Sequence, residues 1–355
     1  MKERLEKDLA LITKVCREMN PHIRAIVLYG GYAREEGGWF QNEGGGWCPY
    51  NDYDILLIVT RRSAPAELEA TRLALASQIG IRWLDIQETS YPELRRSKPT
   101  VMNYELRGTG KVISGDPETL EAIPCFGAGQ LTLKDAEQLC FTRAWTFLGG
   151  LTSEGWNVPY HDEDARFFRN QMAKAWLAVV DALLLSRRIF ADTQAARVQL
   201  LRESYADERE LLESADWALE EKMHPKATTM GAEAVRDLYA RTRKAFLERM
   251  LSVLSFRYGR DLRSTVDLER AMSAGLMPVA RRLKACVLVR GLQPFQHLRS
   301  SLAQMYLVEA NDTTSIELDL LKRGLMHLRR LDLSVPPDAD WNAARLAAAS
   351  KRMNV

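Results

Sequence analysis

An α/β domain followed by an all-helical domain is the fold class that the sequence predicts. Short apolar runs alternate with helical patterns up to about residue 125, and beyond that point the pattern changes to long helical periods. A chain of 355 residues also exceeds what one hydrophobic core usually serves. We therefore expect two domains, an α/β domain at residues 1–125 with a mixed sheet and flanking helices, and an all-α domain at residues 126–355.

The α/β domain begins with a predicted helix. Leu5, Leu9 and Ile12 recur at helical spacing, and the pair Asn20 and Pro21 ends the pattern. After this helix we expect, in chain order, strands at 22–30 and 52–60, a helix at 64–80, a strand at 81–89, and turns around a short edge segment at 103–116.

The helical domain is predicted from apolar stripes with a period near that of an α-helix. The clearest stripe lies in 162–190, where three acidic residues open the segment, as the helix dipole favours. The members of this stripe are Phe168, Met172, Trp176, Val179 and Leu183. Further helices are expected near 132–148, 195–222, 231–257, 266–291 and 314–331.

The composition is that of an ordinary globular protein. With 49 Lys+Arg and 47 Asp+Glu residues, the net charge is +2, which gives no support for gripping a long polyanion. The five cysteines include no close pair, so neither a disulfide framework nor a zinc knuckle is expected. The charged N-terminus does not resemble a signal peptide, and no apolar run approaches the ~20 residues of a membrane helix. We expect a cytoplasmic protein without a membrane partner.

The first functional pattern is an Asp-x-Asp motif at the start of the strand predicted at 52–60. Because side chains alternate along a strand, Asp52 and Asp54 share one face and Tyr53 takes the other. Two carboxylates this close repel each other, and a divalent cation such as Mg²⁺ removes the repulsion. The alternative for an isolated Asp-x-Asp is that one aspartate caps a turn and the other faces solvent.

A glycine pair precedes this motif. Gly30 and Gly31 directly follow the strand at 22–30, and glycines allow backbone amides to approach a phosphate closely. Arg34 lies within reach of the same anion, and its forked donors suit phosphate oxygens. A glycine turn with a surface arginine is the alternative interpretation.

A third carboxylate, Asp85, lies inside the apolar strand at 81–89. Because leucine and isoleucine flank it, its charge needs compensation. If this strand neighbours the one that bears Asp52 and Asp54, the three carboxylates complete a two-metal site. A hydrogen-bonded core or edge aspartate is the alternative.

Together these motifs resemble the nucleotidyltransferases of the DNA polymerase beta-like superfamily. The order is a strand, a glycine pair, Ala-Arg-Glu, an Asp-x-Asp that opens the next strand, and a later strand aspartate. The closest local likeness is to the minimal nucleotidyltransferases, whose signature Gly-Ser-x-Ala-Arg-Gly-Glu corresponds here to residues 30–36. The resemblance covers about residues 20–115.

The resemblance implies magnesium-dependent transfer of a nucleoside monophosphate from a nucleoside triphosphate, with ATP favoured, to an acceptor, and release of pyrophosphate. It implies that Asp52 and Asp54 bind one or both of two magnesium ions. Asp85 would join the catalytic ion and help activate the acceptor hydroxyl. Gly30 and Gly31 would hold the β- and γ-phosphates.

Two features set this chain apart from the minimal enzymes. Gly31 stands in place of the usual serine, which removes a hydroxyl that would hold a phosphate oxygen. The segment 37–51 is longer, and it contains five glycines together with Trp39, Phe40 and Trp47. Such a segment suits either a mobile lid beside the phosphate site or a surface hairpin.

The acceptor is expected to bind to the helical domain, because 126–355 is far longer than closing over a triphosphate requires; a structural or dimer-forming role is the alternative. A small molecule or a protein is favoured over RNA, which would need the basic clusters on one face. These clusters are Arg281, Arg282 and Lys284, and Arg329 and Arg330.

Two other functions stay open. The first is a nucleotide-binding or interaction module without turnover, which Gly31 in place of serine favours. The second is an oligonucleotide-making polymerase, which the near-neutral charge disfavours.

Overall fold

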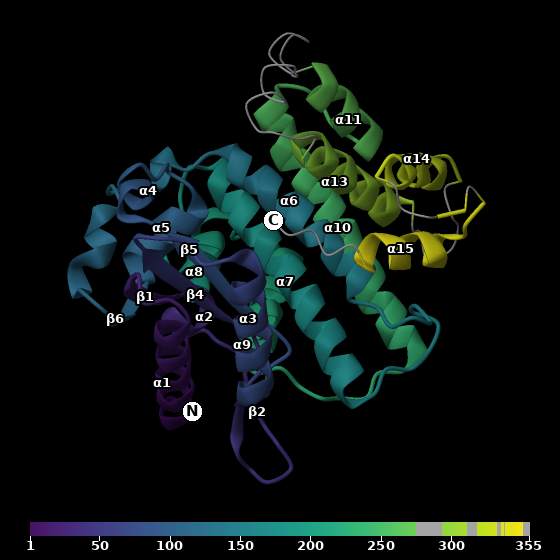
Figure 1. Ribbon diagram of the computed structural model, residues 1–355. Helices are drawn as coiled ribbons and strands as arrows, with labels where there is room; N and C mark the ends of the chain where they lie inside the picture. The colour runs from purple at the N-terminus through teal and green to yellow at the C-terminus, as the bar shows by residue number, and fades with distance from the viewer. Residues whose placement is uncertain (275–292, 311–317, 332–334, 337, 351–355) are drawn as a thin grey trace. The chain divides into compact units, whose positions relative to one another are not determined.

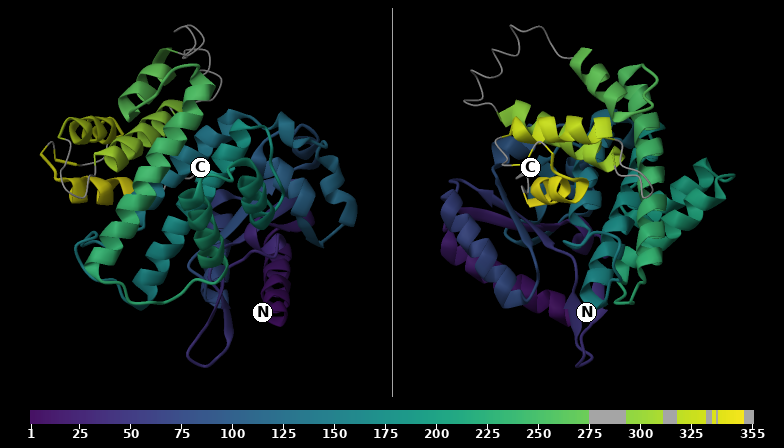
Figure 2. Two further views of the ribbon diagram at one scale, coloured as in Figure 1. Left: turned by 180° about the vertical axis from the view of Figure 1, so that it is seen from behind. Right: turned by 90° about the vertical axis from the view of Figure 1, so that its right-hand side faces the viewer.

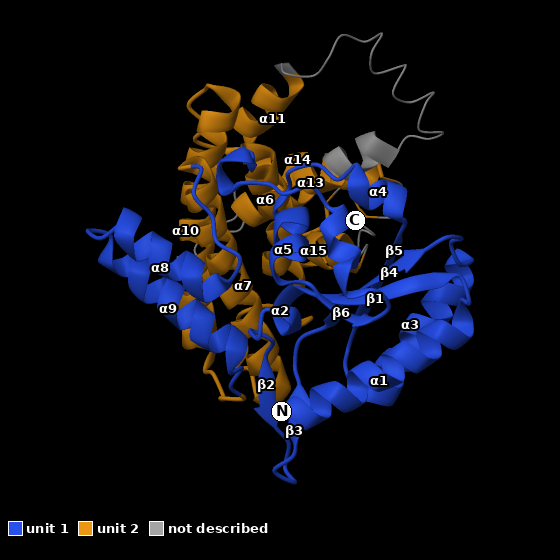
Figure 3. Ribbon diagram, turned by 90° about the vertical axis from the view of Figure 1, so that its left-hand side faces the viewer, with its two compact units in different colours: residues 1–132, 188–226 blue, residues 133–187, 227–355 orange. Residues whose placement is uncertain are grey.

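The chain forms two compact units, shown in Figure 1 and coloured separately in Figure 3. The structure is a computed structural model that describes residues 1–274, 293–310, 318–331, 335–336 and 338–350. The first unit comprises residues 1–132 and 188–226, and the second comprises residues 133–187 and 227–355. The chain therefore leaves the first unit close to the boundary expected near residue 125 and later re-enters it.

A four-stranded mixed sheet in the order β5-β4-β1-β6 forms the centre of the first unit. The strands are β1 (Ile23–Tyr29), β4 (Tyr53–Val59), β5 (Leu84–Thr89) and β6 (Lys111–Ser114). β1 is antiparallel to both β4 and β6, whereas β4 and β5 are parallel. The parallel pair is joined through helix α3 (Pro65–Ile79), which ends at Gly80 in a left-handed C-cap.

One face of the sheet packs on helices α1 (Lys2–Met19) and α3, which lie side by side along it in Figure 3. The strand residues in this core include Ile26, Leu28 and Tyr53. α1 contributes the positions predicted from its helical spacing, so the N-terminal helix is confirmed.

The other face of the sheet packs on short helices. These are α4 (Tyr91–Arg95), α5 (Val101–Thr109) and the 3₁₀ helix η1 (Pro117–Ala122). The strand residues in this second core are Ala25, Val27, Leu56 and Ile58. Because both faces are apolar, polar residues on the central strands occur only near the strand ends.

The segment 103–116 differs in part from the expected turns. Its first half belongs to α5, because the Thr100 hydroxyl accepts a hydrogen bond from the Asn103 N–H and caps the helix. Arg107 then donates to the carbonyl oxygens of Leu120 and Glu121. The expected edge segment is present as β6, which pairs with β1.

Segment 37–51 forms a two-stranded hairpin. Its strands, β2 (Trp39–Gln41) and β3 (Trp47–Pro49), pair antiparallel. Trp39 packs edge-on against Tyr32, with ring centroids 5.5 Å apart. The segment is therefore a hairpin, and Trp39 packs against the sheet core; a role as a lid stays a prediction.

Residues 188–226 contribute two helices to the first unit, α8 (Gln194–Ser204) and α9 (Arg209–Met223). Thr193 caps α8 by accepting a hydrogen bond from the Ala196 N–H. A second short 3₁₀ helix, η2 (Ala128–Gln130), precedes the first crossing into the other unit.

Helices make up most of the described part of the second unit, and an isolated β-bridge joins Tyr160 and Met230 in its loops. The helices are α6 (Leu133–Gly149), α7 (Asp162–Ser186), α10 (Ala232–Tyr258), α11 (Thr265–Ala274), α13 (Gln293–Glu309), α14 (Leu318–Arg329) and α15 (Trp341–Ser350). Figure 2 shows this bundle from two sides, with α7 packed against α10. The apolar stripe predicted for α7 is buried, and Trp176 within it donates to the Thr242 hydroxyl at 3.2 Å.

Some expectations fall outside the described residues. These are the basic cluster Arg281, Arg282 and Lys284, residue Cys286, and most of the helix expected at 266–291. Among the residues that are described, no helix combines the length and apolar composition needed to cross a membrane.

Candidate functional site

A row of three polar side chains crosses the sheet of the first unit. Tyr29, the last residue of β1, is the register partner of Asp54 on β4, and Asp54 is the partner of Asp85 on β5. Partners on strands about 4.8 Å apart project to the same face. Val27 and Leu56 are the next residues on this face toward the middle of the sheet, and both belong to an apolar core. The row therefore lies at the edge of that core. The strands that carry the two aspartates are thus neighbours.

Gly30 lies directly against this row. Its φ is +69°, and a Cβ placed there would lie 1.9 Å from Oδ2 of Asp54. Both the left-handed backbone and the close approach of the carboxylate require glycine. The turn after β1 is therefore fitted to Asp54.

The turn itself is the short helix α2 (Gly30–Ala33), closed by two backbone hydrogen bonds. The Arg34 N–H donates to the carbonyl of Gly30 at 3.2 Å, and the Glu36 N–H donates to the carbonyl of Gly31 at 2.8 Å. A Cβ at Gly31 would lie 3.5 Å from the Glu36 carbonyl oxygen, an ordinary contact. Glycine is therefore required by sterics at position 30 but not at position 31.

Asp52 lies just before β4, and Tyr53 points to the opposite face, as the two-residue period predicts. Tyr53 is fully buried, and its hydroxyl donates to Oδ2 of Asp8 at 3.0 Å. The negative charge of Asp52 helps to raise the pKa values of Asp85 and Tyr29, so Asp52 belongs to the same electrostatic environment as the row.

Asp85 is a carboxylate whose ionised form the fold disfavours. Burial raises its pKa above the ordinary value, and the charge of Asp52 adds to the rise. Gln87 opposes the shift by donating its Nε2 hydrogen to Oδ2 of Asp85 at 3.1 Å, and the Arg72 charge opposes it as well. A half-buried carboxylate with a raised pKa is suited to exchange a proton or to bind a cation.

Tyr29 is a site residue that the sequence analysis did not single out. Its hydroxyl is buried and lies near the Asp85 carboxylate without forming a well-aligned hydrogen bond, and this contact shifts the pKa values of both groups. Burial, together with the charges of Asp54 and Asp85, raises the pKa of Tyr29, so the phenol stays protonated. The two-residue period along β1 could have indicated this residue, because it places Tyr29 on the face opposite Leu28, which is the face that carries Asp54.

Arg72 is a second residue that the sequence analysis missed. It lies on α3, with its guanidinium 3.3 Å from the centroid of the Trp83 ring, and its Nε donates to Glu69 at 2.8 Å. Its Nη1 is buried and has no hydrogen-bond partner among the described residues. The signal was an arginine in the buried stripe of a helix, at a position where the spacing predicts an apolar residue.

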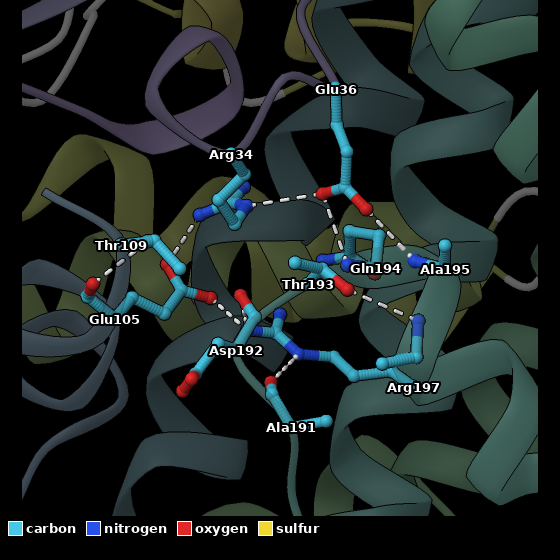
Figure 4. Close-up of polar contacts among 11 residues, drawn as sticks. Arg34, Glu36, Glu105, Thr109, Ala191, Asp192, Thr193, Gln194, Ala195 and Arg197 are labelled. Carbon is cyan, nitrogen blue, oxygen red and sulfur yellow. Dashed lines mark hydrogen bonds and ion pairs between the residues drawn. The ribbon is translucent and has the colours of Figure 1, made fainter.

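Arg34 has partners other than the expected phosphate. Its Nε lies 3.1 Å from Oε2 of Glu36, and its Nη1 lies 2.8 Å from Oε2 of Glu105 on α5 (Figure 4). The side chain is only 7% exposed. Two carboxylates therefore already hold the guanidinium that was expected to contact an anion.

The donor set suits magnesium that arrives with a nucleotide. Asp54 and Asp85 offer hard oxygen ligands from adjacent strands, with Asp52 beside them. Within the part of the chain that the structure describes, no three acidic, histidine or cysteine side chains are gathered into a complete metal site. Magnesium commonly takes only one or two carboxylates and completes its shell with substrate phosphates and water.

Of the basic clusters, the structure describes Arg329 and Arg330, both exposed at the end of α14. With Lys322 they line a surface cavity of about 510 Å³ in the second unit. Lys111, on β6, instead pairs with Glu35 at 2.8 Å on the surface of the first unit.

Comparisons of this chain with protein-family models, with curated proteins and with solved structures find no match.

Proposed function

We propose that this protein is a magnesium-dependent nucleotidyltransferase. It transfers a nucleoside monophosphate from a nucleoside triphosphate, with ATP favoured, to a hydroxyl of a small-molecule or protein acceptor. The observation that carries the proposal is the pair Asp54 and Asp85 on adjacent strands, directly beside a turn where Gly30 leaves no room for a side chain. The sequence resemblance, which rests on the order of the motifs, supports the same chemistry.

The residues have separate roles in this proposal. Bound magnesium would neutralise the phosphate charges and polarise the α-phosphate. Asp52 and Asp54 would hold the ion that accompanies the triphosphate, and Gly30 and Gly31 would let the β- and γ-phosphates approach the backbone. The acceptor oxygen attacks the α-phosphorus, and the bond to the bridging oxygen breaks, so that pyrophosphate leaves. Asp85 would hold the second ion and accept the acceptor proton as the new bond forms.

The acceptor class is proposed from charge. A net charge of +2 supports a small molecule or a protein rather than RNA, because binding of a long polyanion depends on many phosphate contacts. The chemistry needs alignment and charge neutralisation more than a specialised side chain, so it does not itself select the acceptor.

The test uses ATP labelled at the α-phosphate, Mg²⁺ and a cell extract fractionated into metabolites, protein and RNA. Label in metabolites or protein, with pyrophosphate released in proportion, supports the proposal. Asp54→Asn and Asp85→Asn serve as inactive controls. Label mainly in RNA would reassign the acceptor, and ATP binding without pyrophosphate release would favour the binding module. Failure to bind any nucleoside triphosphate would contradict the proposal.

A further inference from the structure

Helix α8 is linked to the glycine turn by a short chain of hydrogen bonds. The N–H of Gln194 donates to Oε2 of Glu36 at 3.0 Å, and the N–H of Ala195 donates to Oε1 at 2.9 Å. The Glu36 N–H in turn donates to the carbonyl of Gly31 at 2.8 Å. Two hydrogen bonds in series therefore separate α8 from the turn that faces Asp54, and Figure 4 shows the contacts of Glu36 with Gln194 and Ala195.

Glu36 is well suited to this link. It is 4% exposed, and its carboxylate accepts two of the backbone N–H groups that a helix start leaves without an intrahelical partner. A carboxylate at this position also interacts favourably with the helix dipole. Thr193 caps a different N–H, that of Ala196, so the two caps do not compete. Glu36 consequently acts as a second cap of α8, supplied from the glycine turn.

Paired charges hold the link from the side. Arg34 bridges Glu36 and Glu105, and Arg197 of α8 pairs with Glu105 as well. Arg197 is fully buried and also donates its Nε hydrogen to the carbonyl of Ala191 at 2.7 Å. The positive charges of two arginines thus neutralise the negative charges of two glutamates. Breaking one of these pairs would leave a buried charge without a partner, which costs several kcal/mol (roughly 3–5), so the pairs keep their geometry.

A second contact joins the same segment to the loop that follows the turn. A Cβ at Gly38 would lie 2.8 Å from the carbonyl oxygen of Lys222 on α9. The segment of residues 188–226 therefore meets the loop at Glu36 through α8 and at Gly38 through α9.

We propose that α8 positions the glycine turn of the nucleotide site through Glu36, and that Arg34 is a positioning residue of this link and not a phosphate ligand. The inference rests on the proposed function for what the turn binds, whereas the coupling of α8 to the turn is independent of it. Residues far along the sequence thereby control the geometry beside Asp54.

The backbone donor from Gln194 can be removed alone. Gln194 is the first residue of α8, where proline is well tolerated, and the extended backbone of Thr193 (φ −112°, ψ 153°) suits a residue before proline. Gln194→Pro therefore deletes one N–H to Glu36 and leaves the helix intact. Gln194→Ala is the matched control, because it removes the same side chain and keeps the N–H.

Two measurements on the full-length chain test the coupling. Amide hydrogen exchange in residues 31–38 reports the turn, and calorimetry reports the Kd of ATP with Mg²⁺. Because a charge-assisted hydrogen bond is lost, we expect Gln194→Pro to speed exchange and to weaken ATP binding by about tenfold each, relative to Gln194→Ala. Equal exchange in the two variants would overturn the inference. If the wild type binds no ATP, the proposed function fails, and the exchange measurement alone still decides the coupling.

Side-chain variants within the loop give an independent test. Glu36→Gln should speed exchange in the turn and weaken ATP binding by about tenfold, because it removes a charged acceptor. Glu35→Gln, at a side chain that is 82% exposed, should change both by less than about twofold. Arg34→Lys should also speed exchange. Weaker ATP binding in Arg34→Lys with unchanged exchange would make Arg34 a direct phosphate ligand and overturn its assignment.

Discussion

Gly30 and Asp54 are matched so closely that no other residue fits at position 30. A Cβ at Gly30 would lie 1.9 Å from a carboxylate oxygen of Asp54, and the backbone there has a φ of +69°. Because Asp54 is also the register partner of Tyr29, the residue just before Gly30, one strand end and one turn define the position of this carboxylate.

The first prediction is that Gly30→Ala abolishes ATP binding. The methyl group must displace the Asp54 carboxylate, and alanine is strained at a positive φ, so we also expect a loss of stability of about 1–3 kcal/mol. Calorimetry with Mg²⁺ and ATP and thermal unfolding measure the two effects. Gly31→Ser is the matched control, because its Cβ makes only an ordinary contact at 3.5 Å. Comparable damage from Gly31→Ser would contradict the steric argument.

The second prediction concerns Asp85, whose pKa burial and the Asp52 charge raise. We expect Asp85→Asn to lower the transfer rate at least about a hundredfold, as loss of a group that stabilises the transition state does. Its melting temperature without metal should equal or exceed that of the wild type, because an unfavourable, partly buried charge is removed.

The sign of the pH dependence follows from the direction of that shift. A raised pKa in the folded state means that folding disfavours the ionised form, so this penalty is absent below the ordinary pKa of 3.8 and complete above the raised value. The stability gain of Asp85→Asn should therefore be largest at neutral pH and vanish toward pH 3.8. A gain that grows on acidification would show that the pKa of Asp85 is lowered instead.

The row of site residues could be predicted in part from the sequence. Alternation along the strands assigned Asp54 and Tyr53 to opposite faces. The sequence left open whether the strands of Asp54 and Asp85 are neighbours, and the structure shows that they are. Tyr29 could have been added by counting back two residues at a time along β1. These features depend on local periodicity, which one sequence displays directly.

The partners of Arg34 could not be predicted in this way. Glu105 lies in helix α5, whereas the glycines after it predict turns there. Glycine is needed at position 108 because a Cβ would lie 2.9 Å from the carboxylate carbon of Asp192. That contact, like the pairing of Arg197 with Glu105, joins segments that are far apart in the sequence. No local pattern indicates that residues 188–226 belong to the first unit.

The third prediction separates the hydroxyl of Tyr29 from its ring. Because this buried hydroxyl makes a poorly aligned contact with Asp85 and no well-formed hydrogen bond among the described residues, Tyr29→Phe should change the melting temperature little. If the hydroxyl contacts the acceptor or a bound phosphate, the same variant should lower the transfer rate by about tenfold or more. Rates and melting temperatures of Tyr29→Phe and wild type, measured side by side, test this, and a clear loss of stability would show that the contact between Tyr29 and Asp85 is a full hydrogen bond.

The fourth prediction concerns Glu105, which balances Arg34 and Arg197. Burial alone would raise its pKa, but the charges of Arg197 and Arg34 outweigh burial and hold the pKa below the ordinary value of 4.5. A lowered pKa means that the ionised form stabilises the fold above pH 4.5 and that this stability is lost as the pH falls through the folded-state value. Glu105→Gln leaves both guanidinium groups without their shared counter-charge, so we expect a loss of about 3 kcal/mol at pH 7. The difference from wild type in urea unfolding should shrink steadily below pH 4.5.

The control is Glu213→Gln, which breaks an exposed helical pair with Arg209 and should cost no more than about 0.5 kcal/mol. Equal losses in the two variants would mean that the four-residue network around Arg34 contributes no more than a surface ion pair.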